Sequence, residues 1–146
     1  MALYPTKEEI LQPYEVPEED KEIIKEWIRK YYNGQWKKYS RNDKIQYLMI
    51  LINNLGKIHD NPPKPFTGPY YSYIPMEKII VLDRNNPSIL STLHEFGHAI
   101  NGESELQACR WSVHLFMACF PKAYSKLVWK GHMLVKPNDK ETTNQH

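Results

Sequence analysis

The chain has 146 residues, of which 41% are hydrophobic and 25% charged, with a formal net charge of +2. This length suits one domain with a single core. The small net charge, without a long basic cluster, argues against a nucleic-acid-binding protein, and no apolar run is long enough to span a membrane.

The N-terminus and the cysteines suggest a compartment. The first ten residues are polar and lack the apolar centre of a secretory signal. The two cysteines, Cys109 and Cys119, would lie about 15 Å apart on one helix, which is too far for a disulfide. We therefore expect reduced cysteines and a cytoplasmic protein.

The first third of the chain predicts three helices. Thr6 starts a capping box for a short helix that ends before Pro13. A second helix is expected over residues 18–32, because acidic residues open it and apolar residues recur at helical spacing. Ser40 is typical of the start of a third helix, over about residues 41–54. We interpret these aromatic-rich helices as scaffold.

A proline-rich stretch, residues 56–69, interrupts this pattern. Its prolines cannot sustain a helix or an interior strand, so we expect a long loop, a feature that favours a functional or lid role. Residues 78–83 form a β-branched run and predict a strand. A second strand is expected within residues 70–74, and a weaker candidate lies at residues 133–136.

The next stretch carries the strongest motif. His94-Glu95-Phe96-Gly97-His98 matches H-E-x-x-H. Histidines four residues apart on a helix share one face and can both reach a single zinc ion. Glu95 would then stand beside the open position of the metal, where it can act as general base on bound water. The alternative is a pair of surface histidines without a metal.

Local signals place this motif on one helix. Asn86-Pro87 predicts its start and Asn101-Gly102 its end. One apolar stripe runs opposite the two histidines, and its members are Ile89, Leu93, Phe96 and Ile100. Gly97 would permit the close approach of another element.

Two further helices are expected downstream. Ser104 with Gln107 predicts a capped helix from Glu105 to about Cys119. Pro121 would begin a short helix to Lys130 that Gly131 closes. The polar tail, residues 137–146, is predicted to be disordered.

A catalytic zinc usually has three protein ligands and a water, so a third ligand is needed. The candidates are Glu103, Glu105 and His114. Helical phase puts Glu105 on a mostly apolar face, where a carboxylate needs a partner and a metal is the natural one. We favour Glu105, and the other two candidates remain open.

The motif and its surroundings resemble a known family. His94-Glu-Phe-Gly-His98 followed by Glu105-Leu-Gln-Ala108-Cys-Arg-Trp111-Ser112 is similar to small cytosolic gluzincins, both ImmA/IrrE-like metallopeptidases and minigluzincins. Trp111 and Ser112 stand for the usual Phe and Ala. The resemblance covers residues 79–120. It implies an α+β, zincin-like fold, mostly helical, with a small β-sheet packed beside the H-E-x-x-H helix.

This resemblance implies a zinc metalloendopeptidase in one domain, residues 1–136, with an N-terminal helical part at about 1–55 and a catalytic core at about 70–120. Zn²⁺ would be held by His94, His98 and Glu105, and Glu95 would activate the zinc-bound water. A protein or peptide substrate could pair with a free edge of the strand Lys78–Asp83.

Several supporting roles stay open. The residues able to stabilise a developing oxyanion are Tyr70, Tyr71, Tyr73, His114 and His132. The residues that could orient the ligand histidines are Asp83, Ser112 and Asn101. The main rival function is a latent or non-proteolytic zinc-binding regulator of a phage or mobile element. A nucleic-acid-associated protein is a second rival, disfavoured by the missing basic stripe.

Overall fold

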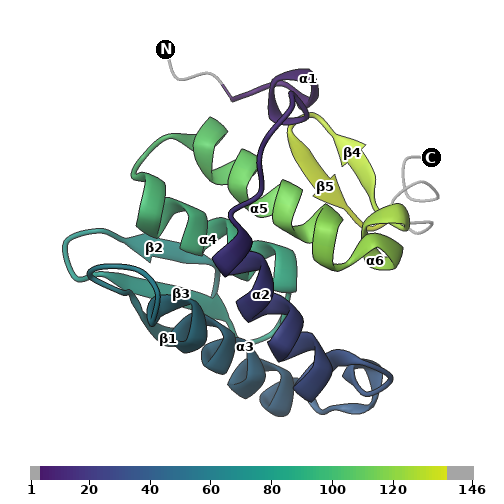
Figure 1. Ribbon diagram of the computed structural model, residues 1–146. Helices are drawn as coiled ribbons and strands as arrows, with labels where there is room; N and C mark the ends of the chain where they lie inside the picture. The colour runs from purple at the N-terminus through teal and green to yellow at the C-terminus, as the bar shows by residue number, and fades with distance from the viewer. Residues whose placement is uncertain (1–3, 138–146) are drawn as a thin grey trace, which may run out of the picture.

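The computed structural model describes residues 4–137 (Figure 1). The tail expected to be disordered therefore lies, apart from Pro137, outside the described residues. The helices are α1 (Lys7–Ile10), α2 (Glu18–Trp27), α3 (Arg41–Gly56), α4 (Ile89–Asn101), α5 (Glu105–Cys119) and α6 (Pro121–Ser125). The strands are β1 (Lys64–Gly68), β2 (Ser72–Ile74), β3 (Ile79–Asp83), β4 (Val128–Lys130) and β5 (Met133–Val135).

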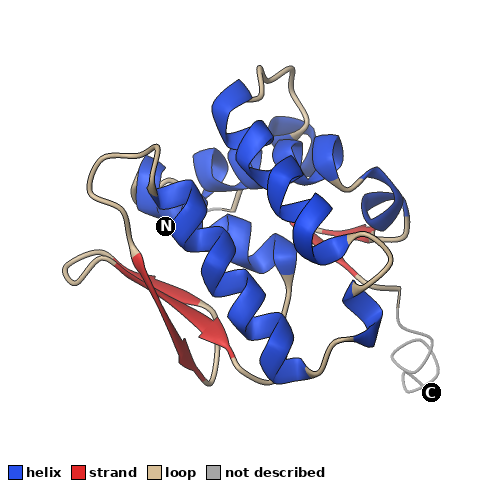
Figure 2. Ribbon diagram, turned by 60° about the horizontal axis from the view of Figure 1, so that its bottom comes forward, coloured by secondary structure: helices blue, strands red, loops and turns tan. Residues whose placement is uncertain are grey.

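The fold is α+β, as the sequence predicts. Figure 2 shows the three-stranded sheet on one side of the helices and the β4–β5 hairpin on the other. Among residues 4–137, no helix combines the length and apolar character needed to cross a bilayer.

Helix caps explain why most helices start where the sequence predicts. The Thr6 hydroxyl accepts from the Glu9 amide, and the Glu9 carboxylate accepts from the Thr6 amide. Ser40 and Ser104 cap α3 and α5 in the same way through their hydroxyls. The second predicted helix runs as α2 and then as a π-helical turn, Ile28–Tyr32, so its expected end at residue 32 is confirmed.

The α4 helix begins later than predicted. Its N-cap is Ser88, whose hydroxyl accepts from the Ser91 amide, and not Asn86. Tyr71 explains the shift, because its hydroxyl donates to the Asn86 carbonyl and accepts from the Ser88 amide, both at 2.8 Å. These bonds hold residues 86–88 outside the helix. The helix ends at Asn101, as expected, with Gly102 at a φ of 79°.

The proline-rich stretch is not wholly a loop, so that prediction was wrong. Residues 64–68 form β1, which pairs in parallel with β3, and β2 pairs antiparallel with the other edge of β3. Pro65 is tolerated because β1 is an edge strand, where a missing N–H can face away from the ladder. β3 is therefore central, and the strand Lys78–Asp83 does not offer a free edge to a peptide.

The region after α5 also differs from expectation. The predicted helix over residues 121–130 ends at Ser125, and residues 128–130 instead form β4, paired antiparallel with β5. Val128 and Trp129 favour a strand, and Gly131 takes a φ of 64° in the turn. The weak strand candidate at residues 133–136 is confirmed as β5.

The core lies between the sheet and the helices. Ile80 and Leu82 of β3 pack with Leu93 and Phe96 of α4, and all four side chains are fully buried. The apolar face of α4 is therefore fixed against the core. The opposite face of α4 carries the two motif histidines and faces α5 and the β4–β5 hairpin.

Gly97 allows α4 and α5 to approach closely, as predicted. A β-carbon added at Gly97 would lie 3.0 Å from the carbonyl oxygen and 3.2 Å from the α-carbon of Ala108. Both contacts are with backbone atoms of α5, which cannot move aside as a side chain can. The absence of a side chain at residue 97 thus sets the spacing of the two helices.

Gly97→Ala should therefore lower the free energy of unfolding by about 1–3 kcal/mol, the usual cost of overpacking. A glycine-to-alanine change in an open helix would instead raise it by up to about 1 kcal/mol. Urea unfolding followed by circular dichroism measures the difference. Adding Ala108→Gly should not restore stability, because the closest contacts are with the backbone of residue 108. A stabilised Gly97→Ala variant would contradict the close approach.

Candidate metal centre

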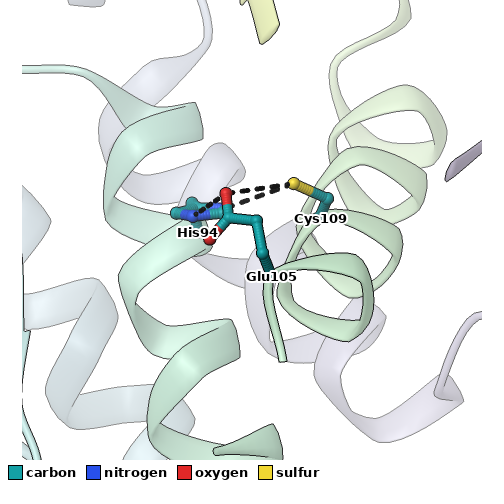
Figure 3. A group of neighbouring side chains, drawn as sticks. All are labelled: His94, Glu105 and Cys109. Atoms are coloured by element: carbon teal, nitrogen blue, oxygen red, sulfur yellow. Dashed lines mark hydrogen bonds and ion pairs between the residues drawn. The ribbon is translucent and has the colours of Figure 1, made fainter. Parts of the chain in front are cut away.

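The two helices bring the motif residues together. His94 and His98 lie one turn apart on α4, and Glu105 is the first residue of α5. Helix α4 ends at Asn101 and α5 starts only four residues later, so the chain folds back and α5 packs along α4. Figure 3 shows the Glu105 carboxylate beside the His94 ring.

The Glu105 carboxylate is surrounded by imidazoles. The Nε2 atom of His98 lies 2.9 Å from Oε1 of Glu105, and the Nε2 atom of His94 lies 3.2 Å from Oε2. A third imidazole comes from the hairpin, where Nε2 of His132 lies 3.9 Å from Oε2. Glu105 is thus the sequence candidate that the structure brings to both motif histidines.

The other two candidates for the third ligand lie elsewhere. Glu103 is exposed to solvent. Nε2 of His114 donates to the Ile10 carbonyl at 2.8 Å, which ties α5 to the end of α1. Neither residue joins the cluster around Glu105.

Cys109, which the sequence did not suggest as part of a metal site, belongs to the cluster. His94, Glu105 and Cys109 each offer a ligand atom, and these atoms lie within 4.8 Å of one another (Figure 3). The thiol lies 3.5 Å from Oε2 of Glu105 and 3.9 Å from Nδ1 of His94. The described residues thus contain a His-Glu-Cys group at metal-binding distances.

The position of Cys109 favours a supporting role over direct ligation. Its thiol faces Nδ1 of His94, whereas Glu105 faces Nε2, and one imidazole cannot turn both nitrogens toward one ion. In the metal-free protein, burial and then the nearby Glu105 carboxylate raise the pKa of the Cys109 thiol to about 12. We therefore interpret Cys109 as the group that orients His94.

His98 is oriented by the backbone. Its Nδ1 donates to the Gly102 carbonyl at 2.9 Å, so Nε2 is left to face Glu105. Nε2 carries a proton when it donates to Glu105, and it is the nitrogen that would offer its lone pair to a metal in the neutral ring.

The three orienting groups proposed from the sequence do not contact the histidines. Asn101 donates to the Gly97 carbonyl and Ser112 to the Ala108 carbonyl, while Asp83 accepts from the Asn85 amide. All three therefore satisfy nearby backbone. That prediction was wrong because short polar side chains bond readily to adjacent backbone, which sequence spacing does not reveal.

The charges of the cluster depend on one another. Hydrogen bonds from His94 and His98 hold the pKa of Glu105 well below its usual range. The hydrogen bond with Glu105 in turn raises the pKa of His98. The pKa of Glu95 is raised, chiefly because burial disfavours its charged form. The pKa values of the neighbouring carboxyl groups of Glu105 and Glu95 are thus shifted in opposite directions.

A cavity of about 260 Å³ opens beside the cluster. Its wall includes His94, Glu95 and Glu105, together with Tyr71 and His132. Of the five oxyanion-stabilising candidates, these last two line the cavity. The Tyr71 hydroxyl already bonds the backbone at the start of α4, whereas the His132 imidazole faces Glu105.

A larger hollow of about 510 Å³ lies elsewhere, and its wall includes Ile100 of α4 and Trp111 of α5. It contains one histidine, His59, which contacts the buried Asp20 at 2.6 Å. Carboxylates of Glu18, Glu19 and Asp20 line this hollow as well. Among residues 4–137, however, the group whose ligand atoms lie at metal-binding distances is His94, Glu105 and Cys109, so the candidate site is the smaller cavity.

Sequence reasoning missed Cys109 as part of this cluster. The signal was available, since Cys109 lies four residues after Glu105 and shares its face of α5. His132 was considered only as an oxyanion donor, because its approach depends on a hairpin that the sequence did not predict.

Comparisons of the chain with protein-family models, with curated proteins and with solved structures find no match. Function is therefore inferred from the chemistry of the site. The donors present, imidazole nitrogens and a carboxylate on helices, are of the kinds that hold divalent metal ions.

Removing the charge of Glu105 should lower the pKa of His98 in the metal-free protein. Glu105→Gln is expected to lower the pKa of His98, because the carboxylate hydrogen bond that favours the protonated ring is lost. NMR titration of the imidazole after chelator treatment measures this pKa. Glu103→Gln, two residues away and exposed, is the control and should leave it unchanged. An unaltered His98 pKa in Glu105→Gln would contradict the contact.

Proposed function

We propose that the protein is a zinc-dependent metallopeptidase of the gluzincin type. The observation that carries this proposal is the Glu105 carboxylate between Nε2 of His94 and Nε2 of His98, with Glu95 on the wall of the same cavity. The proposed activity is the one that the resemblance to small gluzincins implies.

Three side chains would hold the zinc: His94, His98 and Glu105. When bound, zinc would supply Lewis acidity, which polarises a peptide carbonyl and lowers the pKa of water at the site. In the metal-free protein, the hydrogen-bonding protons of His94 and His98 stabilise the charged Glu105 carboxylate. A metal ion would replace those protons.

Glu95 is proposed as the general base. It follows His94 on α4 and therefore projects from the same helix into the cavity. Burial raises its pKa toward the range in which a carboxylate can both take and return a proton. Glu95 would accept a proton from the attacking water and pass it to the leaving amine.

The geometry moves the proposed substrate path from β3 to β2. Both edges of β3 are occupied, whereas one edge of β2 pairs with β3 and the other pairs with no strand among residues 4–137. Tyr71 immediately precedes β2 and lines the cavity. An extended peptide that paired with the free edge of β2 would thus pass beside Glu95.

Metal content tests the site. We expect elemental analysis to find one zinc per chain in the wild type and in Glu103→Ala. Glu105→Ala should hold little zinc, because the carboxylate ligand at the start of α5 is lost. Circular dichroism should confirm that both variants remain folded. A wild type that takes up no zinc, even after reconstitution, would rule out the proposed function.

Turnover tests the role of Glu95. With a diverse peptide library as substrate and mass spectrometry as readout, zinc-loaded wild type should cleave peptides, and Glu95→Gln should lose at least about 100-fold in rate, the usual contribution of a general base. Glu95→Gln should keep its zinc, since Glu95 is not a ligand. Equal cleavage by the variant would contradict this role.

A further inference from the structure

His132 is a histidine of the cluster that the H-E-x-x-H motif does not include. It lies in the turn between β4 and β5, far along the chain from α4, yet its Nε2 is 3.9 Å from Oε2 of Glu105. It lines the same cavity as His94 and Glu95. Its side chain is only 17% exposed, although it stands at the tip of a hairpin.

The hairpin is held in this position by apolar contacts. Trp129 of β4 and Leu134 of β5 pack against a small buried cluster formed by Ile10, Cys109 and Val113. Figure 1 shows the hairpin beside α1 and α5 and away from the three-stranded sheet. The cluster includes Cys109, which contacts His94 and Glu105, so the hairpin is fixed to the wall of the site itself.

The N-terminal segment adds a second restraint. The Tyr4 ring stacks on the His132 imidazole with centroids 4.3 Å apart and an interplanar angle of 7°. The Lys7 ammonium lies 5.9 Å above the Trp129 ring. The stacking on Tyr4 restrains the ring of His132, whose Nε2 faces Glu105.

We infer that His132 is a fourth protein ligand of the proposed metal site, and that the β4–β5 hairpin closes this site. Donor atoms around a tetrahedral zinc, at bonds of 2.0–2.1 Å, are separated by roughly 3.3 Å. The distances from Glu105 to His98, His94 and His132 are 2.9, 3.2 and 3.9 Å. Nε2 of His132 is thus the farthest of the three from Glu105, and it would have to move closer to share an ion bound by this carboxylate.

This inference rests on the proposed function and adds regulation to it. A catalytic zinc keeps one position open for water, whereas four protein ligands are typical of closed, structural sites. While His132 is bound to the metal, the position for water would be filled, which would slow turnover without abolishing it. Faster turnover would require the hairpin to withdraw His132, and the stacking of Tyr4 opposes that movement.

Zinc affinity provides the test. Competition with a chromogenic chelator should show that His132→Asn binds zinc at least about 10-fold more weakly than the wild type, the smallest effect expected when a supporting group of a metal site is lost. Met133→Ala is the matched control, because Met133 lies next in the hairpin, lines the same cavity and is 55% exposed. It should keep the wild-type affinity.

NMR of the imidazole nitrogens gives a direct readout that does not depend on activity. On loading with zinc, Nε2 of His132 should shift together with Nε2 of His94 and His98. His59 and His114 serve as internal controls, since both are engaged elsewhere. A His132 signal that stays unchanged would overturn the inference.

Two results separate the inference from the function on which it rests. If the wild type binds no zinc, the proposed function fails. If the wild type binds zinc and His132→Asn binds it equally well, only the fourth-ligand role fails. At saturating zinc, His132→Asn should cleave peptides faster than wild type. Slower cleavage with unchanged zinc affinity would instead make His132 a transition-state donor and overturn the closure.

Discussion

The close approach of α4 to α5 at Gly97 and Ala108 is the contact on which the site depends. A side chain at residue 97 would meet the backbone of α5 at 3.0 Å, so the helices can approach this far only because residue 97 is glycine. Glu105 lies one helical turn before Ala108 and its carboxylate therefore reaches both His94 and His98. Wider spacing would leave a half-buried carboxylate without its partners, which is costly.

The resulting centre gathers a carboxylate and imidazole nitrogens, which are donor atoms that suit a metal cation. One carboxylate faces three imidazole nitrogens, and in the metal-free protein the hydrogen-bonding protons of His94 and His98 stabilise its charged form. A single zinc ion would bind the same atoms and displace those protons. Glu95, whose pKa is raised by burial, stands next to this centre without being part of it. Under the proposed function, the same turn of α4 would supply both a ligand, His94, and a base, Glu95.

Local signals predicted what local interactions determine. Ser40 and Ser104 form the expected caps, and the phase of α5 correctly set Glu105 apart from the solvent-facing residues. The parts of the fold that were predicted wrongly depend on non-local interactions. Residues 64–68 become a strand only through pairing with β3, and the β4–β5 hairpin is held by packing on distant α1 and α5. Neither interaction leaves a periodic pattern in the sequence, and the approach of His132 to Glu105 follows from the second.

X-ray absorption at the zinc edge of the loaded protein tests the central claim most directly, because it reports the atoms bound to the metal. The arrangement of His94, His98 and Glu105 predicts only nitrogen and oxygen neighbours, at about 2.0–2.2 Å, with the scattering pattern of imidazole rings. A sulfur neighbour at about 2.3 Å would contradict it. Cys109 would then be a ligand rather than the group that orients His94, and the site would not be that of a gluzincin.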